Sequence, residues 1–359
     1  MQFGAQFFPA IDPHEMSGAR YFRESLAIAD EAEKLGLTHA RIVEHYFHPY
    51  GGYSPNPIIF LSALSQRTTT MRLVTGAVLP VFNHPLKLAG EIGMIDAISN
   101  GRVDVGFARA FLPHEFRRFG ISPDESYARF EEGIEQITLL LEREKATHKG
   151  RFHSFEDVTS YPRPTQKPRP KYYIAATTTA ETFAFAGRNG YSLMAIPLGL
   201  KLQENIKVYR NAWREAGHPG RGEAMIAFHM FCHEDKKLAR EIPRKSFDDY
   251  FRLIFEASQD WTTGTSSKDY KGYDQLITKL KGLSLESQIE SGSALVGTPD
   301  EVRAIVAHNI ELYGDFEHAS LQINFGSIPY EDARRSMRLF AQEVMPAYTK
   351  TPAPLSASS

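Results

Sequence analysis

The stretch from residue 40 to residue 79, "ARIVEHYFHPYGGYSPNPIIFLSALSQRTTTMRLVTGAVL", contains the repeating unit from which this chain is built. Its first residues, Ala40–Glu44, form a short apolar run typical of a buried strand. Pro57–Gln66 has helical character after a loop rich in Gly and Pro, and Arg72–Leu79 is again strand-like. A strand, a helix and a second strand in this order predict a parallel pair joined by a right-handed crossover.

The same alternation of strand and helix continues through most of the chain. The sequence predicts eight strands, each followed by a helix: Gln2–Phe8, Ala40–Glu44, Arg72–Leu79, Arg102–Ala108, Tyr172–Ala176, Ser192–Ile196, Ala224–Cys232 and Ala319–Asn324. Eight such units predict an α/β fold, the (β/α)8 TIM barrel. A Rossmann-type sheet is the competing architecture, but the first strand–helix turn, "FFPAIDPHEMSGAR", lacks the GxGxxG pattern that binds a pyrophosphate.

Two insertions interrupt the alternation, one after the fourth strand and one after the seventh. Thr147–Pro170 follows a long predicted helix, Asp124–Arg143, and combines a hairpin-like front with a proline-rich end that indicates an extended strap. The long helical region Asp235–Asn309 contains the polar stretch Gln259–Gly272. We expect a single domain over residues 1–350 and a flexible tail over residues 351–359.

The composition argues against several classes of protein. The 41 Lys and Arg residues are balanced by 43 Asp and Glu residues, so the chain has no basic field that would hold nucleic acid. Cys232 is the single cysteine, which excludes an internal disulfide and a CxxC zinc site and suits a reducing cytosol. The first residues do not resemble a signal peptide, and no apolar run reaches the roughly 18 residues of a membrane span. We therefore expect a cytoplasmic protein with no nucleic-acid or membrane partner.

Polar residues follow four of the predicted strands, at the face where (β/α)8 barrels carry their active sites. In chain order these residues are Glu44, His45, Asn83, His84, Arg109 and Thr177–Thr179. Arg109 offers a planar set of charged donors, and three threonines that open a helix offer hydroxyl and free N–H groups, so together they suit a phosphate. In the alternative interpretation the threonines only cap a helix and Arg109 pairs with a carboxylate.

His45 is the best candidate for proton transfer because an imidazole titrates near neutral pH. Glu44 either orients His45 or binds an arginine. A metal ion held by Glu44, His45, His48 and His84 is disfavoured, because the spacing contains no HExxH or comparable motif.

Two further features indicate a flat, apolar ligand. Gly76 would let a planar ring approach the backbone, although a glycine in a strand also commonly marks a bulge. Aromatic residues near the rim favour a largely apolar substrate pocket, although aromatics at a barrel mouth are also often ordinary packing: Phe8, Tyr46, Phe47, Phe82 and Phe111.

An ordered set of motifs resembles the bacterial luciferase family. The motifs are "EHYF" at residues 44–47, "VLPVFNHP" at 78–85, "MIDAISNGRVDVGFAR" at 94–109, "HEFRRFG" at 114–120 and "SMRLFAQEVMPAY" at 336–348. The resemblance implies a (β/α)8 barrel that binds reduced FMN, or in other branches the deazaflavin F420, at the C-terminal face. It also implies a mobile lid in the segment that contains Gln259–Gly272, where the alternative is an ordinary solvent loop.

The resemblance also implies roles for individual residues. His45 matches a catalytic histidine, and Tyr46 replaces a second histidine that follows it in the luciferase α chain. Arg109 matches an arginine that holds the flavin phosphate. Thr177 matches a phosphate-binding serine, and Thr178 and Thr179 extend that cluster.

Other matched positions lie where the family places the flavin ring. Thr75 and Gly76 match a bend of the third strand with a non-prolyl cis peptide under the ring. Ala176 stands where the luciferase chain has a glutamate near the phosphate, and Ala108 where it has a reactive cysteine beside the ring. These two departures argue against aldehyde-dependent light emission.

The activity implied by the resemblance is that of an FMNH2-dependent monooxygenase. It would use O2 for aldehyde or ketone oxidation, Baeyer–Villiger insertion or hydroxylation of a largely apolar small-molecule or carrier-bound substrate. A separate flavin reductase would supply FMNH2, since the chain has no nicotinamide-binding motif. The alternatives are an F420-dependent reductase or dehydrogenase and a non-catalytic flavin-binding relative.

A homodimer is also implied by the resemblance, through the predicted helices Pro57–Gln66 and Pro85–Ile98. Small and apolar residues in these helices suit close helix packing between subunits but would equally cover the barrel: Ala63, Leu64, Ala89, Gly93, Ile95 and Ala97.

Overall fold

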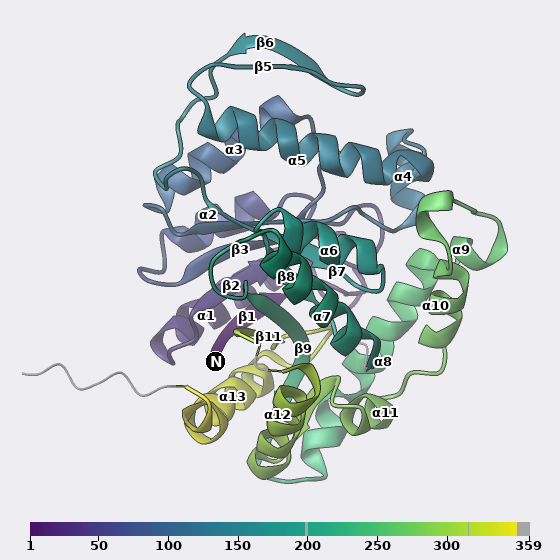
Figure 1. Ribbon diagram of the computed structural model, residues 1–359. Coiled ribbons are helices and arrows are strands. Elements are labelled where there is room, and N and C mark those ends of the chain that lie inside the picture. The colour runs from purple at the N-terminus through teal and green to yellow at the C-terminus, as the bar shows by residue number, and fades with distance from the viewer. Residues whose placement is uncertain (198–199, 315, 350–359) are drawn as a thin grey trace, which may run out of the picture.

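The computed structural model describes residues 1–197, 200–314 and 316–349, and its centre is a closed barrel of parallel strands (Figure 1). The barrel strands, in the order in which they pair, are β1 (Gln2–Phe7), β2 (His39–Ile42), β3 (Arg72–Val78), β4 (Val103–Phe107), β7 (Lys171–Ala176), β8 (Ser192–Ala195), β9 (Ala224–Cys232) and β11 (His318–Gln322). Pairing of β11 with β1 closes the ring. The predicted (β/α)8 barrel is confirmed, and the ends of the strands differ from prediction by at most two residues, as at Ile42 where Glu44 was expected.

Helices cover the outside of this barrel. They are α1 (Gly18–Lys34), α2 (Pro57–Ser65), α3 (Pro85–Ile98), α4 (Pro113–Phe119), α5 (Ser126–Glu142), α6 (Ala180–Arg188), α7 (Leu200–Glu215), α8 (Leu238–Ser258), α9 (Asp260–Thr263), α10 (Tyr273–Leu280), α11 (Leu285–Glu290), α12 (Pro299–Tyr313) and α13 (Tyr330–Leu339). The described part of the chain contains no helix with both the length and the hydropathy of a membrane span.

The region predicted as helical from residue 235 to residue 309 contains a further strand, β10 (Ala294–Gly297). The prediction missed β10 because "ALVG" is too short to distinguish a strand from a helix by its pattern. The nine residues of β9 run beyond the barrel wall, so two strands share one side of β9. Its first half, from Met225 to His229, pairs with β11, and its second half, from His229 to Cys232, pairs with β10.

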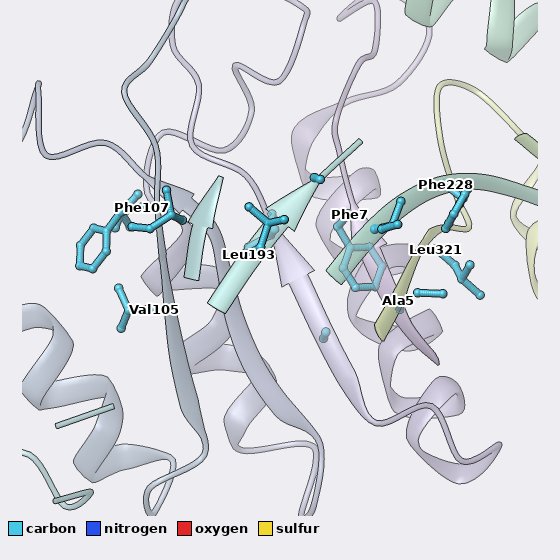
Figure 2. Close-up of a cluster of buried hydrophobic side chains, with 14 of the residues drawn as sticks. Ala5, Phe7, Val105, Phe107, Leu193, Phe228 and Leu321 are labelled. Carbon is cyan, nitrogen blue, oxygen red and sulfur yellow. The ribbon is translucent and has the colours of Figure 1, made fainter. Parts of the chain in front are cut away.

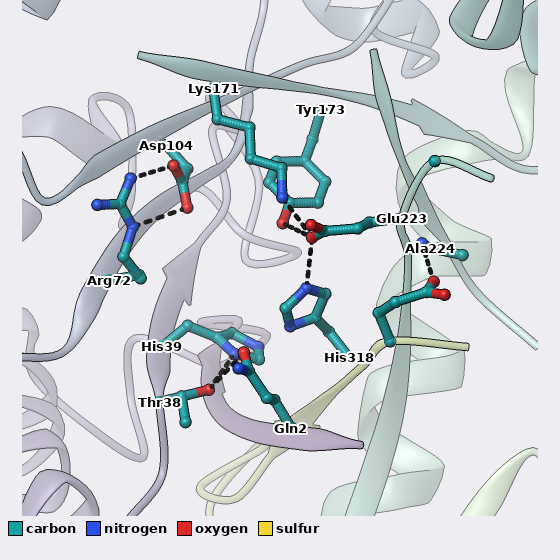
Figure 3. A network of polar contacts seen from close by, with 12 residues as sticks. Gln2, Thr38, His39, Arg72, Asp104, Lys171, Tyr173, Glu223, Ala224 and His318 are labelled. Atoms are coloured by element: carbon teal, nitrogen blue, oxygen red, sulfur yellow. Dashed lines mark hydrogen bonds and ion pairs between the residues drawn. The ribbon is translucent and has the colours of Figure 1, made fainter. Parts of the chain in front are cut away.

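Two kinds of side chain alternate along the barrel strands. Outward-facing residues such as Phe7, Val105 and Leu193 are fully buried against the helices and form the main core (Figure 2). Inward-facing residues fill the lumen, and at the level where the strands begin they are polar: Arg72 pairs with Asp104, and Lys171 and His318 both pair with Glu223 (Figure 3). The lumen is therefore a packed interior with polar layers.

The first insertion has the two parts that the sequence predicts. Its front forms an antiparallel hairpin, β5 (Ala146–Lys149) with β6 (Ser154–Val158). Its proline-rich end crosses α3, where Gln166 Nε2 donates to Asp96 Oδ1 at 2.7 Å and a side chain at Gly93 would lie 2.2 Å from the carbonyl of Pro162. The predicted tail, residues 351–359, lies outside the described residues.

Candidate active site

The polar residues at the strand ends meet on one rim because β2, β3, β4 and β7 are consecutive neighbours in the barrel. His45 lies three residues beyond the end of β2, and Asn83 follows β3. Arg109 and Thr177 follow two strands that pair directly, with Phe107 of β4 opposite Ile174 of β7. The fold thus brings together side chains that are more than 130 residues apart in the sequence, on the C-terminal face.

His45 forms a pair with a carboxylate that the sequence analysis did not identify. Its Nδ1 lies 3.1 Å from Glu115 Oε1, and that oxygen also accepts the backbone N–H of Tyr46 at 2.9 Å. Glu115 has no exposed surface, and His45 is 8% exposed. Because Oε1 already acts as an acceptor, we assign the Nδ1 proton to His45 as donor, which leaves Nε2 available to exchange a proton.

Glu115 lies in the first turn of α4, a helix that the sequence analysis left out. The signals were present: Pro113 stands at the first position of the helix, and Gly120 ends it in the left-handed conformation with φ 66°. The carboxylate is 70 residues from His45 in the sequence, so only the folded chain reveals the pair.

Glu44 orients neither His45 nor an arginine through a hydrogen bond in the described part of the chain. Its Oε1 accepts from the Tyr46 hydroxyl at 2.5 Å and from Asn83 Nδ2 at 2.8 Å, and its Oε2 accepts from the Leu79 N–H at 3.1 Å. Burial raises the pKa of Glu44 to about 8, although these three donors act in the opposite direction. Glu44 therefore fixes the ends of β2 and β3 relative to each other.

His84 is exposed and lies apart from the His45–Glu115 pair. Its Nδ1 accepts from the Leu86 N–H at 3.3 Å at the start of α3, and its ring contacts that of His153 in the first insertion at 4.4 Å. These contacts are those of a helix cap. Among the residues that the structure describes, no group of three or more His, Cys, Asp or Glu side chains could hold a metal ion.

Arg109 has no carboxylate partner in the described ranges. Its Nη1 donates to the backbone carbonyl of Asp269 at 3.3 Å, and its guanidinium lies 5.0 Å from the ring of Tyr270 and 5.6 Å from that of Tyr127. Thr179 occupies the N-cap position of α6, but its side chain makes no capping hydrogen bond. The arrangement leaves a cation, hydroxyl groups and a helix N-terminus available for an anion.

Small residues lie on or directly after the strands that carry Arg109 and Thr177 and on the neighbouring strand β3. Thr75 is fully buried, with its hydroxyl bonded to both backbone groups of Gly106, and a cis peptide joins Gly76 to Ala77. Ala108 is half-buried and Ala176 is buried. A side chain at Gly76 would lie 2.1 Å from Arg41 Nε, so this part of the lumen has room only for glycine.

The rim aromatics divide into two groups. The rings of Phe8 and Phe111 contact His45, with centroids at 5.6 and 5.9 Å. Tyr46, Phe47 and Phe82 instead gather around Phe119 at the end of α4, at 4.9, 5.4 and 4.7 Å. Only the first group lines the space beside His45.

The polar insert, residues 259–272, lies against the site. It includes α9 and a short 3₁₀ turn, Lys268–Tyr270. Trp261 Nε1 donates to the carbonyl of Phe111 at 2.7 Å and the Tyr270 hydroxyl donates to that of Ala110 at 2.8 Å. The Asp269 carboxylate accepts the Tyr127 N–H at the start of α5 at 3.1 Å, so the insert is held next to Arg109.

Comparison with known proteins identifies the family of this chain. A family model described as luciferase-like monooxygenase matches residues 1–315. The structure of monooxygenase RslO1 from Streptomyces bottropensis is 41% identical, with a TM-score of 0.86 over 97% of this chain and 100% of that chain. The oxygenase component of a flavin-dependent trigonelline monooxygenase from Acinetobacter baylyi is 28% identical over 92% of this chain and 91% of its own length.

More distant structures share the fold. The oxygenating constituent of 3,6-diketocamphane monooxygenase from Pseudomonas putida, solved with FMN, has 22% identity and a TM-score of 0.80 over 98% of this chain and 99% of that chain. A coenzyme F420-dependent tetrahydromethanopterin reductase from Methanopyrus kandleri has 18% identity and a TM-score of 0.72 over 97% of this chain and 99% of that chain.

Proposed function

Because this chain belongs to the luciferase-like monooxygenase family, we propose that it is the oxygenase component of a two-component, FMNH2-dependent monooxygenase. The observation that carries the proposal is the His45–Glu115 pair on the same rim as Arg109 and Thr177. The His45–Glu115 pair can transfer a proton, and Arg109 with Thr177 can bind a phosphate. A protein that uses reduced flavin mononucleotide needs both functions.

The residues present fit FMN. Arg109, Thr177, Thr178 and Thr179 would hold the phosphate, because they offer a cation without a carboxylate partner in the described ranges and hydroxyls at a helix N-terminus. Thr75, Gly76, Ala108 and Ala176 would lie along the ring, and at Gly76 the Arg41 side chain fills the space that a larger residue would need. When bound, reduced flavin supplies the electrons that activate O2.

The chain's own contribution is proton control and exclusion of water. Glu115 accepts the hydrogen bond from the Nδ1 proton of His45. Nε2 of His45 is then free to exchange a proton with the flavin or the substrate in the barrel lumen. Phe8 and Phe111 cover His45 with apolar rings, which suits a largely apolar substrate. We further propose that residues 259–272 act as a lid, since they cover the Arg109 guanidinium through one hydrogen bond to the Asp269 carbonyl and one ring contact with Tyr270.

A separate reductase would supply the FMNH2, which is in line with the name of the trigonelline relative as an oxygenase component. The test is to mix the purified protein with chemically reduced FMN and O2 and to measure substrate-dependent O2 consumption, with an aldehyde, a ketone and a phenol as probes. Incorporation of ¹⁸O from ¹⁸O2 into the product would support a monooxygenase. Binding of F420 in preference to FMN, with hydride transfer and no O2 uptake, would establish the deazaflavin alternative instead.

We propose that the protein forms a homodimer through α2 and α3. Four of the six residues proposed for this contact from the sequence, Leu64, Ala89, Gly93 and Ile95, are buried within the chain. Other apolar side chains of these helices are exposed instead: Ile59 is 70% and Met94 57% exposed. Replacing both residues by Glu should convert a dimer into a monomer in analytical ultracentrifugation, and a monomeric wild type would contradict the proposal. A cytoplasmic location stays a prediction.

A further inference from the structure

Four polar side chains stand in one register row across neighbouring strands of the barrel. Gln6 of β1 pairs with Arg41 of β2 on one side and with Gln322 of β11 on the other, and Gln322 pairs with His229 of β9. All four side chains are more than nine-tenths buried. This row lies across the barrel from β4 and β7, which carry Arg109 and Thr177, so the phosphate site does not use it.

Arg41 is a buried cation without a carboxylate partner in the described part of the chain. Its Nη1 donates to Gln6 Oε1 at 3.3 Å and its Nη2 to the carbonyl of Gly76 at 3.2 Å, and both acceptors are neutral. A guanidinium has five N–H donors, and Nε is buried without a partner. Burial lowers the pKa of Arg41 to about 10, so it stays charged at neutral pH. An uncompensated charge in this position is costly unless an anion joins it.

The rest of the row also has unused polar atoms. His229 Nε2 and Gln322 Oε1 are buried and have no hydrogen-bond partner among the described residues. Burial lowers the pKa of His229 to about 3, so this ring is neutral and adds no second charge. The row therefore presents one positive charge together with neutral hydrogen-bonding groups.

Flat aromatic side chains connect this row with His45. The ring of Tyr250 lies 4.5 Å from that of His229, and its hydroxyl lies 3.2 Å from that of Tyr50. Phe8 contacts Tyr50 at 4.6 Å and His45 at 5.6 Å. Phe8 and Tyr250 also contact each other at 5.4 Å, so these rings form one continuous aromatic wall from the row to His45.

We propose that Arg41, with Gln6, Gln322 and His229, forms a binding site for an oxyanion that is delocalised over a planar ring. Such an anion comes from an ionised phenol or enol of the substrate, or from the deprotonated pyrimidine edge of the reduced flavin. This inference rests on the proposed function for its biological meaning, but binding at the row can be tested without O2 and without turnover.

The first arm of the test uses para-nitrophenol, whose ionised form is yellow and whose neutral form is colourless. The full-length protein with oxidised FMN should bind the phenolate and shift the ionisation of the bound probe to lower pH, because Arg41 stabilises the anion. Arg41→Met should weaken phenolate binding roughly tenfold to a hundredfold. Arg41→Lys should restore part of it, and para-nitroanisole, which cannot ionise, should bind both proteins alike.

Other titratable groups near the row are kept constant in this comparison. They are His39 on β2, Tyr50, Tyr250 on α8, His229 on β9, His45, and the carboxyl groups Glu44 and Glu115. Gln322→Leu removes a neutral member of the row without altering any of them. It should weaken phenolate binding less than Arg41→Met, and it keeps the proposal testable if the Met variant does not fold.

The second arm identifies the source of the anion. Reduced FMN is titrated anaerobically with the protein, and its absorbance reports whether the bound ring is neutral or anionic. If Arg41→Met shifts this ionisation to higher pH while phenolate binding is unchanged, the flavin edge is the ligand; the opposite result identifies the substrate. If folded Arg41→Met and Gln322→Leu proteins change neither titration, the row is not an oxyanion site, whether or not the protein proves to be a monooxygenase.

Discussion

The two ends of the barrel lumen contain similar residues but pair them differently. Where the strands begin, each charge has an opposite charge: Arg72 binds Asp104 through two nitrogens, and Glu223 holds both Lys171 and His318 (Figure 3). Where the strands end, Arg41 and Arg109 have only neutral acceptors in the described ranges.

This difference indicates that one end of the lumen stabilises the fold and the other end binds a ligand. A complete ion-pair network needs nothing from outside the protein, whereas buried donors without partners are costly in the free protein and are satisfied by a ligand. The C-terminal end of the lumen is therefore where substitutions should change binding and turnover, and the N-terminal end is where they should change the free energy of unfolding.

The largest expected effect is that of His45→Ala. Loss of a positioned general acid or base typically lowers a rate by ~10²–10⁴. Product formation should fall by that factor, while the thermal melt and FMN affinity stay close to wild type and hydrogen peroxide is released in place of product. Paired measurements of product, peroxide and melting temperature check this. An undiminished product yield would show that His45 is not the catalytic group.

Arg109→Ala should weaken FMN by roughly tenfold to a hundredfold, because a charge-assisted hydrogen bond to phosphate contributes about 1.5–3 kcal/mol. Riboflavin lacks the phosphate and should bind wild type and variant equally, which isothermal titration can measure for both ligands. Equal losses for FMN and riboflavin would mean that Arg109 supports the ring or the insert at residues 259–272, and the phosphate assignment would be wrong.

A smaller effect is expected for Glu115→Gln. The amide oxygen can still accept from the Tyr46 N–H and from His45, so only the negative charge is lost, and a fall in kcat of about tenfold is expected. Product formation should fall while the melting temperature stays close to wild type. A purely structural role would lower the melting temperature together with turnover.

The fold could be predicted from the sequence because each strand and each helix signal is local. The strand-end positions of His45, Arg109 and Thr177 follow from the same signals, since the end of a strand in a parallel barrel faces one rim. The short strand β10 could not be predicted in this way, because "ALVG" is too short to show a strand pattern and its partner β9 lies more than 60 residues earlier.

The two most informative polar contacts were missed for related reasons. Glu115 meets His45 across 70 residues of sequence, and no local pattern encodes that distance. Arg41 stands inside the apolar run of the second strand, where only its charge distinguishes it from its neighbours. A charged residue within a buried strand was the available signal, and its partners on β1 and β3 became visible only in the fold.

The smallest expected effect tests the other end of the lumen, with Glu223→Gln. The hydrogen bond from His318, together with Lys171, lowers the pKa of Glu223 to about 2, below its value in an unfolded chain. A carboxyl group with a lowered folded pKa stabilises the protein above about pH 4.5, and this contribution is lost as the pH falls toward 2. Because the side chain is 40% exposed, we expect only ~1 kcal/mol, or a melting temperature lower by about 1–2 °C at pH 7. The variant's melting temperature should approach that of wild type as the pH falls, while FMN affinity and turnover at pH 7 remain unchanged. A loss of turnover without loss of stability would mean that the two ends of the lumen do not divide their roles, because a charge network remote from the ligand would then be setting the chemistry at the other rim.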